Sequence, residues 1–164
     1  MSEIKDSGIR TQFATGAVRD IQDDKGRCDL IPLDAAGECF NGADGNILSN
    51  ISCFMGTGEK KYLVNAIQAF CRINNWTITE AMLEVSMHYK QGSEKYGERN
   101  WEKGIPLHSY IDSGVCHVLK YLDGQNDERH DRAFVWNMLG AIWTMEHKPE
   151  MIDIPFEMLS GATE

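Results

Sequence analysis

Acidic and imidazole side chains recur at helical spacing in two stretches of the sequence. In ITEAMLEVSMH, Glu80, Glu84 and His88 are four residues apart, so a helix would stack them on one face. In DERHD, Glu128 and Asp131 are three residues apart, which brings two carboxylates towards one cation. Facing helices that each supply such a set form metal sites inside helical bundles, and Mg²⁺ takes oxygen ligands. The pattern therefore indicates divalent-metal binding.

A structural interpretation also fits these acids. The helix dipole alone favours acids in a first turn, which accounts for Glu80, Asp127 and Glu128 without a metal. Glu84 and Asp131 are expected deeper in their helices, where the dipole does not explain them. On the metal interpretation, Glu84→Ala should leave folding intact or raise the melting temperature, and should remove the stabilisation that a metal provides.

Basic side chains mark two further segments. GSEKYGERNW, residues 92–101, combines two bases, two aromatic rings and an amide between two expected helices, which neither a plain loop nor a core segment needs. Near the N-terminus, Arg19, Lys25 and Arg27 lie among glycines. They form either a solvated loop or a flap that binds phosphate, because guanidinium, ammonium and glycine amide groups suit phosphate oxygens. The Walker A motif is absent.

Three polar side chains fall within apolar helical patterns. Each of His117 and His130 is either a core histidine paired with a neighbour or a ligand contact. Asn137 shares a face with His130 in the most apolar stretch of the sequence. A buried amide needs a partner, which is either structural or a ligand.

Four helices are expected to position these groups. The first covers EKKYLVNAIQAFCRI, whose apolar residues share one face. The second is capped by Thr77 or Thr79, with Glu80 able to complete a capping box with Thr77, and ends at Gly92. The third covers LHSYIDSGVCHVLKYLDG. The fourth begins near Asp127 and is apolar nearly all round over residues 133–145, which indicates burial on most sides.

The rest of the chain is expected to be irregular. We predict one domain, residues 1–164, with an N-terminal arm over 1–56, a helical bundle over 58–147 and an irregular tail over 148–164. The fold class is all-α, a bundle of about four main helices with a long, mostly irregular N-terminal arm. Three partner helices give an apolar fourth helix too little cover, so a homodimer or homotetramer is predicted.

Composition limits the function classes. The chain has 164 residues and a net charge of −9, from 25 acids and 16 bases, which argues against binding to nucleic-acid polymers. No apolar run reaches the roughly 20 residues that a membrane helix needs, and no secretory signal is recognisable. The five cysteines form no C-x-x-C pair. Reduced thiols and a cytoplasmic location are expected.

Several of these runs together resemble a known family. GAVRD…KGRCDLIP, LEVSMHY…GSEKYGERNWEKGIP and DSGVCHVLKYLDG…DERHDRAFVWNMLGAIW resemble the phage-borne dATP/dGTP diphosphohydrolases, MazG-like proteins of the MazZ type. The resemblance runs from about residue 13 to residue 156, and KYG-x-x-NW is its most specific signature. It implies an oligomeric, MazG-like helical bundle that uses Mg²⁺ or Mn²⁺ to split a deoxypurine triphosphate into monophosphate and pyrophosphate. For a phage-encoded protein, the location would be the host cytosol.

The resemblance also implies roles for individual residues. Glu80 and Glu84 stand where one acidic set of the family lies, and Glu128 with Asp131 has its E-x-x-D spacing. Two metal ions would be held by Glu84, Glu128 and Asp131, with Glu80 or His88 nearby. Glu80 and Glu84 would be the catalytic residues, with Glu80 as the acceptor of a proton. In the loop, the basic side chains Lys95 and Arg99 would contact phosphate, and the ring of Tyr96 or Trp101 would stack on the nucleobase. The Asn100 amide would recognise an edge of the nucleobase or hold the loop. The implied nucleotide-binding set is Arg19, Lys25, Arg27, Lys95, Tyr96, Arg99, Asn100, Trp101, His117, His130 and Asn137.

Two departures from the family pattern support a second hypothesis. Lys90 stands where members have Glu, and Cys116 stands where they have Arg. Positive charge in place of a carboxylate favours holding an anion over holding a cation. The alternative is a non-catalytic protein that binds and sequesters a nucleotide or a nucleotide-derived signal.

Overall fold

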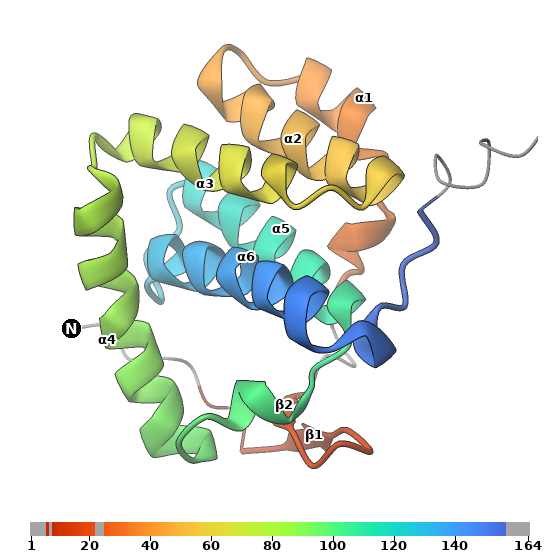
Figure 1. Ribbon diagram of the computed structural model, residues 1–164. Helices are drawn as coiled ribbons and strands as arrows, with labels where there is room; N and C mark the ends of the chain where they lie inside the picture. Colours follow the sequence, from red (N-terminus) through yellow and green to blue (C-terminus); the bar gives the residue numbers. More distant parts are fainter. Residues whose placement is uncertain (1–5, 7, 22–24, 157–164) are drawn as a thin grey trace, which may run out of the picture.

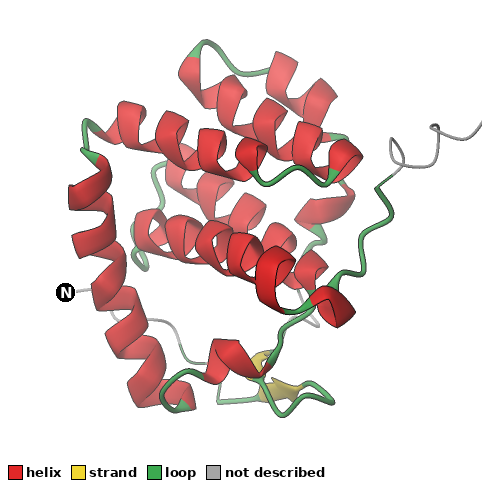
Figure 2. Ribbon diagram, viewed as in Figure 1, coloured by secondary structure: helices red, strands yellow, loops and turns green. Residues whose placement is uncertain are grey.

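The computed structural model describes residues 6, 8–21 and 25–156, and this part of the chain is mostly helical (Figures 1 and 2). The predicted all-α class is confirmed, with one small addition, an antiparallel hairpin that pairs Thr11 with Arg19. Within the described ranges, no helix is long and apolar enough to cross a membrane.

In chain order the elements, with η for 3-10 helices, are β1 (Arg10–Gln12), β2 (Val18–Asp20), η1 (Cys28–Leu30), α1 (Leu33–Glu38), α2 (Ala43–Thr57), α3 (Lys61–Asn74), α4 (Ile78–Tyr96), η2 (Asn100–Lys103), α5 (Leu107–Leu122), α6 (His130–His147) and η3 (Pro149–Met151).

The antiparallel pair α5 and α6 forms the centre of the molecule. Helices α2 and α3 cover one side of this pair, and α4 descends beside it at a steep angle towards the β1–β2 hairpin (Figure 1). Phe70 of α3 ties the layers together, with its ring centroid 5.1 Å from that of Tyr121 in α5 and 4.7 Å from that of Phe134 in α6. One continuous core therefore supports every helix around the central pair.

The prediction that residues 1–56 are mostly irregular is wrong for its second half. Glycines in NGADGN suggested turns, but Gly42 precedes α2 and Gly45 lies inside it. At Gly45 a Cβ atom would lie 2.5 Å from the carbonyl oxygen of Gly37, so glycine is what allows α1 and α2 to pack closely. Helix α2 then buries four apolar side chains at helical spacing, Ile47, Leu48, Ile51 and Phe54.

Helix α4 starts as predicted and ends later. The Thr77–Glu80 capping box is present, with Thr77 Oγ1 accepting from the Glu80 amide at 3.1 Å and Glu80 accepting from the Thr77 amide at 2.7 Å. The predicted end at Gly92 is wrong, because the helix continues to Tyr96 and stops at Gly97, whose φ is 91°. A glycine inside a helix costs only about 1 kcal/mol, which tertiary contacts of the last turn offset. The first half of GSEKYGERNW is therefore helical.

Helix α6 begins at His130, three residues after the predicted start, so Asp127 and Glu128 lie in the preceding turn. It packs against α3, α4 and α5, and none of its large apolar side chains is exposed. The single chain thus supplies the cover that was expected from a partner. A homodimer or homotetramer stays a prediction, but the burial of α6 no longer supports it.

Candidate functional site

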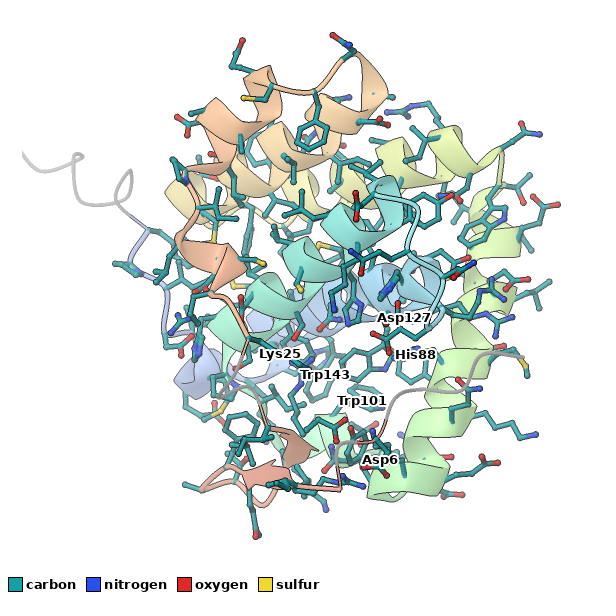
Figure 3. The ribbon with its side chains drawn as sticks, turned by 180° about the vertical axis from the view of Figure 1, so that it is seen from behind. Asp6, Lys25, His88, Trp101, Asp127 and Trp143 are labelled. Carbon is teal, nitrogen blue, oxygen red and sulfur yellow. The ribbon has the colours of Figure 1, made fainter. Side chains whose placement is uncertain are left out.

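A cavity of about 250 Å³ opens between the hairpin, α4, η2, α5 and α6. Figure 3 views the molecule from this side, with Lys25, His88 and Trp101 labelled around it. Aromatic rings and cationic side chains make up much of its wall, a composition suited to a flat, anionic ligand. Among the residues predicted from the sequence, those that line it are Arg19, Lys25, His88, Tyr96, Arg99, Asn100, Trp101, His117, Glu128 and Asn137. Those that do not are Arg27, Glu80, Glu84, Lys95, His130 and Asp131.

Three ligand atoms lie close together beside this cavity, two of them on residues that line it. Nδ1 of His117, from α5, lies 3.0 Å from Nδ1 of His130 at the start of α6. Oε1 of Glu128 lies 3.6 Å from the first of these nitrogens and 3.5 Å from the second. In the described part of the chain, this is the one group of three or more His, Cys, Asp or Glu residues whose ligand atoms lie within 4.8 Å of one another.

The chemistry of this group fits a metal ion. Ligand atoms about 2.1 Å from a tetrahedral cation lie about 3.4 Å apart, close to the three separations observed. Nε2 of His130 is 2.8 Å from Oδ1 of Asp127, the carboxylate–imidazole contact that orients metal-binding histidines. Burial and the neighbouring His130 lower the pKa of His117, which keeps the imidazole in its neutral, ligating form. Two imidazoles and one carboxylate suit a first-row transition ion better than Mg²⁺, which prefers oxygen ligands.

Glu84 and Asp131 have different partners. Oε2 of Glu84 is 2.7 Å from Nη2 of Arg132 and 3.0 Å from Nη2 of Arg129. Arg129 also makes a two-pronged contact with Asp131, at 2.7 and 2.9 Å. The hydrogen bond from Arg132, ahead of those from Arg129, lowers the pKa of Glu84. The structure therefore does not gather Glu84, Asp131, Glu128 and His88 into one ligand group, because arginines occupy two of the four.

Glu80 and His88, predicted to share a helical face with Glu84, also have different surroundings. Glu80 is exposed and its carboxylate completes the capping box, as the structural interpretation held. His88 lines the cavity, with its ring centroid 5.7 Å from that of Trp136. Burial lowers the pKa of His88 to about 4, so this imidazole is neutral at physiological pH.

The KYG-x-x-NW segment holds the hairpin against the bundle. Asn100 is buried, its amide oxygen accepting from the Val18 backbone at 2.9 Å and its amide nitrogen donating to the Val18 carbonyl at 2.8 Å. Nζ of Lys95 is 2.7 Å from Oδ2 of Asp20. Of the two roles proposed for Asn100, holding the loop is the one these contacts show. Asn100 and Lys95 therefore hold Val18 and Asp20, the residues on either side of Arg19.

Two predicted cations on the surface have acidic partners next to them in the sequence. Arg27 forms a two-pronged ion pair with Asp29, at 2.6 and 2.7 Å. Arg99 contacts Glu102 and lies at the cavity rim. The aromatic members of the loop are better placed for a ligand, since Trp101 lines the cavity and packs edge-on against Trp143 at 5.0 Å.

The sequence reasoning missed several cavity residues. Asp112, Ser113, Cys116 and Lys120 line the cavity from α5, and Trp136 does so from α6. The signal was available, because Asp112, Cys116 and Lys120 are spaced four residues apart and Ser113 is four before a predicted site histidine. Asp112 accepts from the Cys28 amide at 2.6 Å, and burial raises the pKa of its carboxyl group.

This all-α bundle has an aromatic cavity beside a cluster of metal-ligand atoms, and helical bundles form ligand and metal sites in this way, from side chains on facing helices. A family model described as dATP/dGTP diphosphohydrolase, N-terminal, matches residues 72–154, just over half of the chain. The chain therefore belongs to this family of diphosphohydrolases. The matched residues include α4, α5 and α6, whereas the hairpin, α1 and α2 lie outside them. Comparisons with curated proteins and with solved structures gave no match.

Proposed function

We propose that the protein is a divalent-metal-dependent diphosphohydrolase that splits dGTP or dATP into the monophosphate and pyrophosphate. One observation carries the proposal. His117 and Glu128 place a set of metal-ligand atoms in the wall of a cavity that also has aromatic and cationic walls. A single cavity thus offers a place for a cation, for phosphates and for a base. Family membership supports the same class of reaction.

The residues around the cavity divide the work. A divalent cation held by His117, Glu128 and His130 would neutralise phosphate charge and polarise the phosphoryl oxygens. Lys25 and Lys120 line the same cavity and bring further positive charge for the triphosphate.

Asp112 is the better placed proton acceptor. Glu80, the acceptor expected from the sequence, caps α4 away from the cavity. Asp112 lines the cavity, and one of its oxygens is fixed by the Cys28 amide. Because burial raises the pKa of Asp112, its carboxylate is a stronger base than an exposed one.

Pyrophosphate release is the direct test. The protein is incubated with each deoxynucleoside triphosphate in Mn²⁺ or Mg²⁺, and we expect pyrophosphate from the purine substrates, faster with Mn²⁺. Glu128→Gln should lose the activity, whereas Glu94→Gln, an exposed position of α4 outside the cavity, should keep it. Absence of release from all substrates with both metals would contradict the proposal.

A second function, nucleotide sequestration without hydrolysis, is favoured by a specific observation. Arg129 and Arg132 form ion pairs with Glu84 and Asp131, so these two carboxylates are not available to a metal ion. The cavity beside them is lined by three cationic side chains, Arg19, Lys25 and Lys120. Calorimetry with and without a chelator separates the two functions. Tight binding that ignores the chelator and leaves the nucleotide intact supports sequestration, and binding abolished by the chelator supports the enzyme.

A further inference from the structure

Arg19 is a partly buried cation that forms no ion pair with a carboxylate in the described part of the chain. Its Nη2 donates to Ser113 Oγ at 3.0 Å and to Asn137 Oδ1 at 3.1 Å, and its guanidinium lies 5.6 Å from the ring centroids of both Tyr110 and Trp136. Its Nη1 is buried without a hydrogen-bond partner, and no carboxylate of the described chain forms an ion pair with it. The side chain lines the cavity.

Such a group selects what enters the cavity. Burial lowers the pKa of Arg19, but a guanidinium stays charged in proteins. A buried donor that finds no acceptor costs the full price of its lost hydration, more when it carries charge. A ligand that brings acceptor atoms to Nη1 recovers that cost, and a ligand that brings another donor does not.

The position of Arg19 favours a base over a phosphate. Its contacts Ser113 and Asn137 lie four residues before His117 and seven residues after His130, which is about 6 Å and about 10 Å further along the two helices than the metal-ligand cluster. Phosphates belong at the cluster end. The walls around Arg19 are aromatic rings, which accept the flat face of a base.

We infer that Arg19 determines base specificity by donating to the carbonyl edge of a 6-oxopurine, so that the cavity prefers guanine or hypoxanthine to adenine. This inference rests on the proposed function, because it places the triphosphate at the metal-ligand cluster. Guanine presents O6, with N7 beside it, as an acceptor for Nη1, whose hydrogens are not used by Ser113 or Asn137. Adenine presents N7 beside the N6 amino group, whose hydrogens would face the N–H groups of Arg19.

The chain holds Arg19 ready for this task. Val18 and Asp20, on either side of it, are clamped by Asn100 and Lys95. Asn137 is held in one orientation, because its amide nitrogen donates to the Ala133 carbonyl at 2.8 Å while its oxygen accepts from Arg19. A preformed donor loses little entropy when a ligand binds, which favours discrimination.

Binding measurements with the full-length protein test the inference without requiring catalysis. Calorimetry in Mn²⁺ compares dGMP, dIMP, dAMP and the monophosphate of 2-aminopurine deoxyriboside. We expect dGMP and dIMP to bind about ten- to a hundredfold more tightly than the two ligands that lack the 6-oxo group. A preference that follows the 2-amino group, or a preference for dAMP, would overturn the inference. This panel needs no variant, so misfolding cannot obscure it.

Variants then assign the preference to Arg19. Arg19→Lys keeps the charge but removes the planar guanidinium with its Nη1 donor. The ratio of dGMP affinity to dAMP affinity should fall close to one, while inorganic tripolyphosphate binds as before. Arg10→Lys, in the neighbouring strand and outside the cavity, is the matched control and should keep the wild-type ratio. If Arg19→Gln weakens tripolyphosphate and Arg19→Lys restores it with the base ratio unchanged, Arg19 binds phosphate and the inference is wrong. A role confined to folding would lower the melting temperature of Arg19→Lys and leave the ratio unchanged, which also overturns it.

The two proposals fail in different ways. Equal pyrophosphate release from dGTP and dATP, with equal binding of dGMP and dAMP, removes the specificity inference and leaves the enzyme. A clear 6-oxopurine preference without pyrophosphate release supports the role of Arg19 in binding and removes the enzyme.

Discussion

Two acidic groups flank the start of α6, and one short run, DERHDR, contributes residues to both. In the first, Glu84 and Asp131 are paired with Arg129 and Arg132. In the second, Glu128 lies beside two imidazoles, within 3.6 Å of each. A carboxylate between guanidinium groups is already neutralised, whereas a carboxylate beside imidazole nitrogens adds its lone pair to those of the imidazoles. The comparison shows that the partner, more than the spacing of the acids, decides whether a carboxylate is neutralised or joins other ligand atoms.

The division follows from where the helix begins. Glu128 and Arg129 precede α6, so helical periodicity does not constrain their side chains. Glu128 turns towards His117 on α5, and Arg129 turns towards Glu84 on α4. Had α6 begun at Asp127 as predicted, Glu128 and Asp131 would have shared a face.

Replacing Glu128 should have the largest effect. Glu128→Gln removes the one carboxylate of the metal-ligand cluster, so pyrophosphate release should fall at least about 100-fold. This exceeds the loss of activity usual for a residue that only orients a metal ligand. The rise in melting temperature with Mn²⁺ should disappear as well, because only a ligand of the native state adds stability. A wild-type Mn²⁺ response in this variant would exclude the cluster as a metal site.

Asp127 tests the support of the same cluster. Asp127→Asn keeps an acceptor for His130 but removes its charge, and should weaken Mn²⁺ affinity about tenfold, the lower end for a residue that orients a metal ligand. Titration with Mn²⁺, followed by the electron spin resonance signal of the free ion, measures the affinity. An affinity equal to that of wild type would show that Asp127 does not orient the histidine.

Glu84→Gln should show the opposite pattern. Arg132 is buried and would lose its charged partner, so the free energy of unfolding should fall by about 1–2 kcal/mol, a small value for a buried pair because Glu84 is partly exposed. The Mn²⁺ response should remain. This outcome reverses the expectation from the sequence, which assigned the metal to Glu84. Urea unfolding with and without Mn²⁺ decides, and loss of the Mn²⁺ response would return Glu84 to the metal site.

The smallest effect is a dependence of this ion pair on pH. Because Arg132 lowers the pKa of Glu84 below its ordinary value of 4.5, the pair stabilises the fold fully above that value. Its contribution is lost as the pH falls through the lower pKa of the folded state. The difference in unfolding free energy between wild type and Glu84→Gln should therefore be constant near neutral pH and shrink below about 4.5. A difference that grew on acidification would contradict the assignment.

Local signals in the sequence were enough for part of the fold. The Thr77–Glu80 capping box and the extent of α5 were predicted from capping chemistry and apolar periodicity, which depend on neighbours in the chain. Helix α2 was missed because its glycines suggest a turn until α1 packs against them. The end of α4 was missed because contacts of Lys95 with the distant hairpin outweigh a glycine inside the helix.

The candidate site divides in the same way. From the sequence alone came the residue types and the expectation that Asn137 needs a partner, whereas the nucleotide-binding role for Arg19 stays a prediction. Only the tertiary structure showed that these two residues contact each other, that Asn100 clamps the hairpin, and that Glu128 joins two histidines. Spacing along a helix restricts which side chains share a face, but it carries no information about the charge of the element packed opposite. Helix packing brought arginine to Glu84 and imidazole to Glu128, and these contacts decided which carboxylate is left to hold a cation.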